Sequence, residues 1–152
     1  MDMGSRLIIV CGLPGSGKTT LSRKLEEELS ATRFCPDEWM HALSIDIYDE
    51  DRRSKIEALQ WKLAQNLLVQ GASVIIEWGT WGRTERDVLR TRARALGAAV
   101  ELHHLSATPD VLFDRIQRRG MESPPIERNT VLQWFEKFEA PTTEEIALFD
   151  KP

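Results

Sequence analysis

Short apolar runs alternate along the chain with longer stretches in which apolar residues recur every three or four positions. The runs lack an apolar–polar alternation, as expected of strands that are covered on both faces. The longer stretches have the period of amphipathic helices. This alternation predicts a parallel sheet with helices packed against it.

Four segments are expected to form strands: residues 7–11, 33–35, 73–76 and 99–105. The second is weak, and Pro36 limits it because proline has no N–H to donate. No further strand is visible in the sequence. The pattern therefore predicts an α/β three-layer sandwich in which helices flank a parallel sheet of four or five strands.

Helical periodicity is expected after residue 17, over residues 51–70, 84–96 and 108–119, and around residues 131–138. Glycines follow three of these stretches and are natural helix ends. The buried faces are predicted to carry Leu21, Leu25 and Leu29 in the first helix, and Ile56, Leu59, Leu63 and Leu67 in the second.

The bulk composition sets limits on the class of protein. A length of 152 residues fits one domain, residues 1–152. No apolar segment approaches the ~18 residues of a membrane-spanning helix. The first apolar run stops at Gly12, too early for the apolar core of a signal peptide. We therefore expect a cytoplasmic protein with no membrane partner.

Charge and cysteine content narrow the class further. The net charge of −4 and the pI near 5.5 provide no general attraction to nucleic acid, although a local basic patch would be compatible with them. Cys11 and Cys35 belong to no CxxC or Cys/His cluster, so zinc is not expected and both thiols are expected to be reduced.

The segment GLPGSGKT at residues 12–19 matches the phosphate-binding pattern GxxxxGK[ST] without deviation, between an expected strand and an expected helix. Glycines let successive N–H groups turn toward a phosphate chain, and the helix N-terminus adds a positive dipole. A lysine at position 18 would reach the β- and γ-phosphates, and the hydroxyl of residue 19 would bind Mg²⁺. The predicted nucleotide-binding residues are Gly12, Pro14, Gly15, Ser16, Gly17, Lys18, Thr19 and Thr20.

Two acids follow expected strands and would lie at the same edge of the sheet as this loop. Asp37 is either a general base for an attacking hydroxyl or an ordinary loop residue that caps the next helix. Glu77 ends the third strand, where a carboxylate could hold Mg²⁺ directly or through water. Its alternative is a strand-end acid in solvent.

Basic and aromatic residues supply further candidates. Arg115 and Arg119 share a helix face and would either clamp phosphates or form a solvated basic helix end. The stretch from residue 77 to residue 86 has the composition of a binding rim, although core packing of one tryptophan is an equal alternative. With Asp37, the predicted acceptor-binding residues are Trp39, Trp78, Arg83 and Arg86.

The chain resembles the small bacterial P-loop kinases grouped as AAA-family ATP-binding proteins, which are related to polynucleotide 5′-hydroxyl kinases, chloramphenicol phosphotransferase and zeta toxins. The resemblance covers nearly the whole chain and rests on GLPGSGKTTL, PDEW, GASVIIEWG and LFDRIQRRG. It implies a P-loop NTPase fold with a helical lid at about residues 115–130. It also implies that Asp37 is the general base and that Arg115 and Arg119 contact ATP phosphates.

The sequence departs from the polynucleotide kinases at several positions. They often have aspartate where this chain has Glu77, and arginine where it has Glu38. An acid at position 38 would repel a nucleic-acid phosphate. The last strand that helps to hold adenine in the family is not visible here.

These observations predict an ATP- and Mg²⁺-dependent kinase that transfers the γ-phosphoryl group to a hydroxyl of a small molecule or nucleoside. The predicted catalytic residues are Asp37, Lys18, Arg115 and Arg119, with Thr19 and Glu77 at the metal. A polynucleotide 5′-hydroxyl kinase and a non-catalytic ATP-binding switch module remain as alternatives. The identity of the acceptor and the oligomeric state do not follow from the sequence.

Overall fold

The computed structural model describes residues 4–122 and 124–152. Its sheet has four parallel strands in the order β2-β3-β1-β4, which confirms the expected fold class. The strands are β1 (Arg6–Cys11), β2 (Thr32–Phe34), β3 (Ser73–Gly79) and β4 (Ala99–His104). β3 is longer than expected, so the sheet reaches beyond Glu77.

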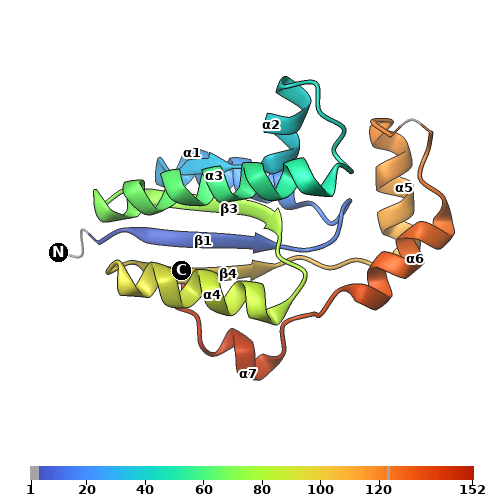
Figure 1. The fold of residues 1–152 in the computed structure, drawn as a ribbon. Helices are drawn as coiled ribbons and strands as arrows, with labels where there is room; N and C mark the ends of the chain where they lie inside the picture. Colours follow the sequence, from blue (N-terminus) through green and yellow to red (C-terminus); the bar gives the residue numbers. More distant parts are fainter. Residues whose placement is uncertain (1–3, 123) are drawn as a thin grey trace.

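Helices lie on both faces of this sheet and beyond the carboxyl ends of its strands (Figure 1). They are α1 (Lys18–Leu29), α2 (Pro36–Ala42), α3 (Glu50–Val69), α4 (Arg83–Ala95), α5 (Pro109–Arg119), α6 (Arg128–Lys137) and α7 (Thr143–Ile146). Figure 1 shows α5 and α6 past the arrowheads of β1 and β4, at the end of the sheet where the loop after β1 also lies.

The side chains of β1 point alternately into two apolar clusters. Leu7 and Ile9 pack into the cluster that α3 and α4 cover, whereas Ile8 and Val10 pack into the one that α1 covers. All four are fully buried. A central strand covered on both faces needs apolar residues at every position, and this is why β1 shows no alternation in the sequence.

The predicted apolar face of α3 is wrong in part. Leu59 and Leu63 are 51% and 40% exposed, and the buried face is formed by Ile56, Gln60, Trp61, Ala64 and Leu68. The inward face can include Gln60 because its Oε1 accepts a 2.9 Å hydrogen bond from Nε1 of Trp78. Similarly, Leu29 at the end of α1 is exposed, while Leu21 and Leu25 pack against the sheet.

The C-terminal segment covers the edge of β4. The N–H of Asp150 donates to the carbonyl of Val100 at 2.7 Å, and Oδ2 of Asp150 accepts from the Val100 N–H at 2.8 Å. These bonds satisfy backbone groups that a fifth strand would otherwise pair. No fifth strand is present in the part of the chain that the structure describes.

In the first turn of α4, Arg86 forms a fully buried ion pair with Glu145 of α7. Nε of Arg86 lies 2.6 Å from Oε2 of Glu145. This pair ties the C-terminal segment to the helix layer. Among residues 4–122 and 124–152, no helix is long and apolar enough to cross a membrane.

Candidate functional site

The loop between β1 and α1 has the backbone shape that its glycines allow. Gly15 has φ of 83°, and an added Cβ would lie 2.9 Å from the carbonyl oxygen of Leu112 in α5. An added Cβ on Gly12 would lie 2.6 Å from the carbonyl oxygen of Leu105. Any larger residue at these positions would push the loop away from its neighbours, so close packing as well as turn geometry requires glycine.

Two polar side chains of this loop, Lys18 and Ser16, are available to bind an anion. The Nζ of Lys18 is turned onto the carbonyl oxygens of Gly12 and Leu13, at 2.9 and 3.0 Å. Burial lowers the pKa of Lys18, against the opposing attraction of Glu77. The buried Ser16 Oγ has no hydrogen-bond partner. An anionic phosphate chain would supply acceptors to both groups.

Glu77 is buried at the end of β3 and joins three elements. Its Oε2 accepts a 2.8 Å hydrogen bond from Oγ1 of Thr19, and its Oε1 accepts a 2.9 Å bond from Nε of Arg33. Ser22 of α1 also donates to it. The alternative of a solvent-facing acid is therefore wrong, because Glu77 is only 6% exposed.

Sequence reasoning missed Arg33, the cation that compensates Glu77. Its Nη2 also lies 2.5 Å from Oε2 of Glu38, and these two carboxylates raise the pKa of Arg33 although burial opposes them. Burial would raise the pKa of Glu38, but Arg33 and Arg23 hold it below its ordinary value. A buried acid such as Glu77 requires a cation, and Arg33 on the neighbouring strand β2 was the available one.

Asp37 lies in the first turn of α2 rather than at its cap. The helix begins at Pro36 after Cys35, and no side chain caps it. The carboxylate of Asp37 pairs with Nη2 of Arg53 from α3. Arg53, a second residue that sequence reasoning missed, also reaches Glu57 at 3.7 Å and thereby ties Asp37 to α3.

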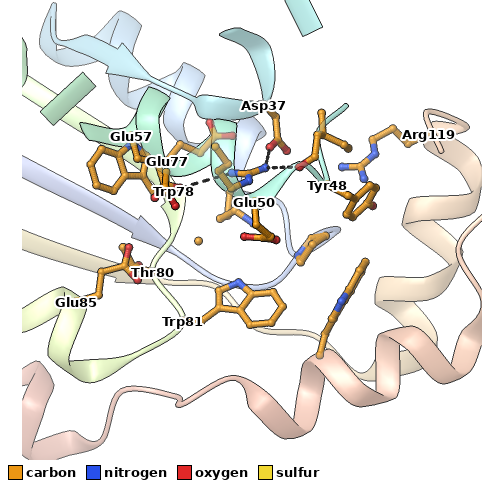
Figure 2. A pocket seen from close by; sticks show the side chains of 17 residues that line it. Asp37, Tyr48, Glu50, Glu57, Glu77, Trp78, Thr80, Trp81, Glu85 and Arg119 are labelled. Carbon is orange, nitrogen blue, oxygen red and sulfur yellow. Dashed lines mark hydrogen bonds and ion pairs between the residues drawn. The ribbon is translucent and has the colours of Figure 1, made fainter. Parts of the chain in front are cut away.

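Two adjoining cavities meet at Lys18, Asp37, Glu77 and Arg119, which line both of them. The first, which we call the P-loop cavity, has a volume of about 560 Å³ and is also lined by Gly15, Gly17, Thr19, Thr20 and Arg115. The second, which we call the aromatic cavity, measures about 320 Å³. Its other lining residues include Trp134. Figure 2 labels five more of them: Tyr48, Glu50, Glu57, Trp78 and Trp81.

The segment over these cavities is formed by α5, α6 and their connection. Nη1 of Arg115 donates to the carbonyl of Gly15 at 3.1 Å, whereas Nη2 of Arg119 lies 2.5 Å from Oε1 of Glu122. The expected lid at residues 115–130 corresponds to the end of α5, the connection and the start of α6. Residue 123 within it lies outside the described residues.

Of the residues predicted to bind the acceptor, Asp37 and Trp78 line the aromatic cavity. Arg86 does not line either cavity, contrary to the expectation that it binds the acceptor. It is 0% exposed and donates hydrogen bonds to Glu145 and to the carbonyls of Thr80 and Glu139. Trp39 packs edge-on against Phe34, and Arg83 pairs with Asp87. Neither Trp39 nor Arg83 is among the residues that line the two cavities.

The oxygen groups near the P-loop suit a magnesium ion. Among the described residues, no group of three or more His, Cys, Asp or Glu side chains is arranged to hold a metal. Mg²⁺ does not require one, since it usually binds one or two protein oxygens together with phosphates and water. The Thr19 hydroxyl and the Glu77 carboxylate, 2.8 Å apart, are oxygens of the required kind.

Curated proteins similar to this chain include kinases. A gluconokinase from Arabidopsis thaliana is 27% identical over 146 residues, covering 87% of this chain and 76% of its own length. A shikimate kinase from Mesorhizobium japonicum is 27% identical over 121 residues, covering 77% of this chain and 57% of its own length. An uncharacterised protein from Mycobacterium tuberculosis is 34% identical over 132 residues, but this chain spans only 26% of it.

Solved structures share the fold over most of the chain. An unliganded sugar kinase from Janibacter sp. HTCC2649 matches with a TM-score of 0.66 and 26% identity, covering 93% of this chain and 82% of its own. A chain of the Pnkp1/Rnl/Hen1 RNA repair complex matches with a TM-score of 0.78 and 17% identity. The match covers 99% of this chain and 48% of the other.

The model of the family described as AAA domain matches residues 7–141. That range contains the P-loop, Asp37, Arg115 and Arg119, which line the two cavities. The curated relatives include a gluconokinase and a shikimate kinase, and a solved gluconokinase from Sinorhizobium meliloti shares the fold. This chain therefore belongs to the AAA domain family of P-loop kinases.

Proposed function

We propose that this protein is an ATP- and Mg²⁺-dependent kinase that phosphorylates a hydroxyl group of a small molecule. The observation that carries the proposal is the position of Asp37. Its carboxylate lines both the P-loop cavity and the aromatic cavity, together with Lys18. A base at this junction can reach a hydroxyl in one cavity while the phosphate chain occupies the other.

The residues of the P-loop cavity bind and hold the nucleotide. Backbone N–H groups of residues 15–19 surround its phosphates, and Lys18 exchanges its two carbonyl partners for phosphate oxygens. Arg115 and Arg119 neutralise negative charge from the lid. Thr19 and Glu77 would hold Mg²⁺, which would offset phosphate charge and orient the transferred group.

Asp37 acts on the acceptor. Its carboxylate accepts the proton of the hydroxyl that attacks the γ-phosphate. The ion pair with Arg53 keeps the side chain in place and restricts its rotation. The lid segment shields the junction from water, which limits loss of ATP by hydrolysis.

The acceptor is proposed to be small because the aromatic cavity is confined. Its volume of about 320 Å³ falls at the lower end of small-molecule sites. The repulsion expected from Glu38 is a weaker argument than the sequence indicated, since Arg33 and Arg23 compensate that carboxylate. The lining of the aromatic cavity by carboxylates is the stronger argument against a phosphate-bearing acceptor.

The test is transfer of label from γ-labelled ATP to a panel of sugars, nucleosides, antibiotics and a 5′-hydroxyl oligonucleotide, with Mg²⁺ present. We expect a labelled small-molecule product. Transfer to the oligonucleotide alone would instead establish the polynucleotide kinase, the alternative favoured by the fold shared with the RNA repair complex. ATP binding with no transfer to any acceptor would favour the switch module.

A further inference from the structure

The aromatic cavity has more carboxylates than cations in its lining, and the role inferred for it rests on the proposed kinase function. Carboxylates of Asp37, Glu50, Glu57, Glu77 and Glu85 line it, against the cations Lys18, Arg53 and Arg119. If a bound acceptor carried a negative charge, it would need a cation that is free to meet it.

Each of these cations already has a partner. Arg53 pairs with Asp37, and Arg119 pairs with Glu122. Lys18 is bonded to the P-loop carbonyls and is the group that would meet nucleotide phosphates. Within the described residues, the cavity therefore offers no uncommitted cation to a carboxylate or phosphate on the acceptor.

Three of the five carboxylates lack such compensation, whereas Asp37 pairs with Arg53 and Glu77 with Arg33. Glu50 and Glu85 have no hydrogen-bond or ion-pair partner among the described residues, and Glu57 has only Arg53 at 3.7 Å. Burial, followed by repulsion from Glu85, raises the pKa of Glu57 to about 7. Burial also raises the pKa of Glu85, against the attraction of Arg86. These acids would gain from a cation that the protein does not supply.

A further polar group lines the cavity without a partner. Thr80 is only 1% exposed, and its Oγ1 makes no hydrogen bond. Its backbone is in the left-handed region with φ of 46°, a conformation that threonine rarely adopts. A buried hydroxyl left unpaired is costly, and a ligand with hydroxyl or amine groups would satisfy it.

Aromatic side chains form another part of the lining of the aromatic cavity. Trp78, Trp81 and Tyr48 surround the cavity in Figure 2. Trp81 meets Trp134 edge-on with ring centroids 6.4 Å apart, and Tyr48 stacks on Trp134 at 6.4 Å. Such walls accept the apolar face of a compact ring, and they also attract cations through the negative faces of their π systems.

We propose that the phosphoryl acceptor is a polyhydroxylated ring that carries a protonated amine, of the amino-sugar or aminocyclitol class. Its ring lies between the aromatic side chains and its ammonium group faces Glu50, Glu57 and Glu85. One ring hydroxyl points toward Asp37. The oxygen of that hydroxyl forms a bond to the γ-phosphorus as the bond from this phosphorus to the β–γ bridging oxygen breaks, so that ADP leaves. The hydroxyl proton moves to Asp37.

This specificity differs from what the names of the relatives suggest. Gluconate and shikimate carry carboxylates, which the free acids of the aromatic cavity would repel. A 5′-hydroxyl nucleic-acid end carries a phosphate one nucleotide away and would meet the same repulsion. The cavity therefore selects against anionic acceptors and in favour of cationic ones.

The test is isothermal titration of the full chain, saturated with a non-hydrolysable ATP analogue and Mg²⁺. The probes are glucosamine, glucose and gluconate as one matched set, and 2-deoxystreptamine with myo-inositol as a second. In at least one set we expect the amine to bind about tenfold or more tightly than its neutral partner, as for a charged hydrogen bond gained on binding. We expect gluconate to bind most weakly. Equal or tighter binding of the neutral or anionic probe in both sets would overturn the inference.

Variants separate this result from general effects. Glu50→Gln and Glu85→Gln should each reduce the preference for the amine severalfold and leave binding of the ATP analogue unchanged. Glu27→Gln on the exposed face of α1 is the matched control and should change neither. A preference that survives both cavity variants would also overturn the inference. Loss of ATP binding in the wild type would be the separate failure of the proposed kinase function.

Discussion

Oγ1 of Thr19 donates a 2.8 Å hydrogen bond to Oε2 of Glu77, which joins the first turn of α1 to the buried end of β3. Because Arg33 holds the other oxygen of Glu77, the carboxylate is fixed from two sides. The P-loop, the end of β3 and β2 are thereby connected around the site where a nucleotide would bind.

The first prediction concerns the affinity for nucleotide. Lys18→Ala removes the ammonium group that would exchange two carbonyl partners for phosphate oxygens. We expect ATP binding to weaken by about tenfold or more, since a hydrogen bond to a charged group contributes roughly 1.5–3 kcal/mol. Isothermal titration measures this, with Lys24→Ala on the exposed side of α1 as control. Equal affinity of the Lys18 variant and the wild type would contradict the proposed nucleotide site.

The second prediction separates chemistry from binding. Asp37→Asn keeps the shape of the side chain but removes the base, so turnover should fall on the order of 10²-fold or more while ATP affinity is retained. Arg53→Ala should reduce turnover less, because Arg53 positions Asp37 through their ion pair. Steady-state kinetics with the accepted substrate provide the measurement. Asp51→Asn, on the exposed side of α3, is the control, and an unchanged rate in Asp37→Asn would remove that residue from its role.

The third prediction concerns the lid. Arg119 is held by Glu122 at 2.5 Å and must leave it to reach nucleotide phosphates. Glu122→Gln removes the competing charge, and we expect the KM for ATP to fall severalfold. Glu136→Gln, an exposed acid on α6, should leave KM unchanged. A raised KM in the Glu122 variant would mean that the ion pair supports the closed lid instead of competing with nucleotide.

The fourth prediction is a pH dependence of stability. The pKa of Glu57 is raised from 4.5 to about 7, by burial first and then by Glu85 and Glu50 against the attraction of Arg53. The folded state therefore holds an extra proton between about pH 4.5 and 7, and stability falls as pH rises through this window.

Glu57→Gln removes this penalty. The variant should gain stability relative to wild type at pH 8 and show little gain at pH 4.5. The gain should not exceed about 3.5 kcal/mol, because one pKa unit corresponds to about 1.4 kcal/mol. Urea unfolding at the two pH values tests it. A gain of the same size at both pH values would show that ionisation of Glu57 is not its cause.

The fifth prediction concerns the corrected residue Arg86. Arg86→Ala leaves Glu145 as a buried, unpaired charge, and we expect a loss of about 3–5 kcal/mol in the free energy of unfolding. The double substitution Arg86→Met with Glu145→Leu removes both charges and should lose much less. If the two variants were equally destabilised, lost packing rather than the unpaired charge would explain the effect.

Local patterns in the sequence were enough to predict the sheet, the P-loop and most helices. Short unbroken apolar runs next to glycines are typical of strands covered on both faces, and the glycine spacing of residues 12–17 leaves the backbone few other shapes. The positions of Asp37 and Glu77 at the carboxyl ends of strands followed from the parallel topology, which brings such ends to one edge of the sheet.

The tertiary structure alone decided which distant side chains meet. Arg53 reaches Asp37, Arg33 reaches Glu77, and Arg86 turns inward to Glu145 instead of toward a substrate. A sequence pattern specifies the face of an element, but the direction and partner of a long charged side chain depend on how elements pack. For the same reason the sequence could mark residues 77–86 as a binding rim, but it could not show that Tyr48, Glu50 and Trp134 from other elements complete the aromatic cavity.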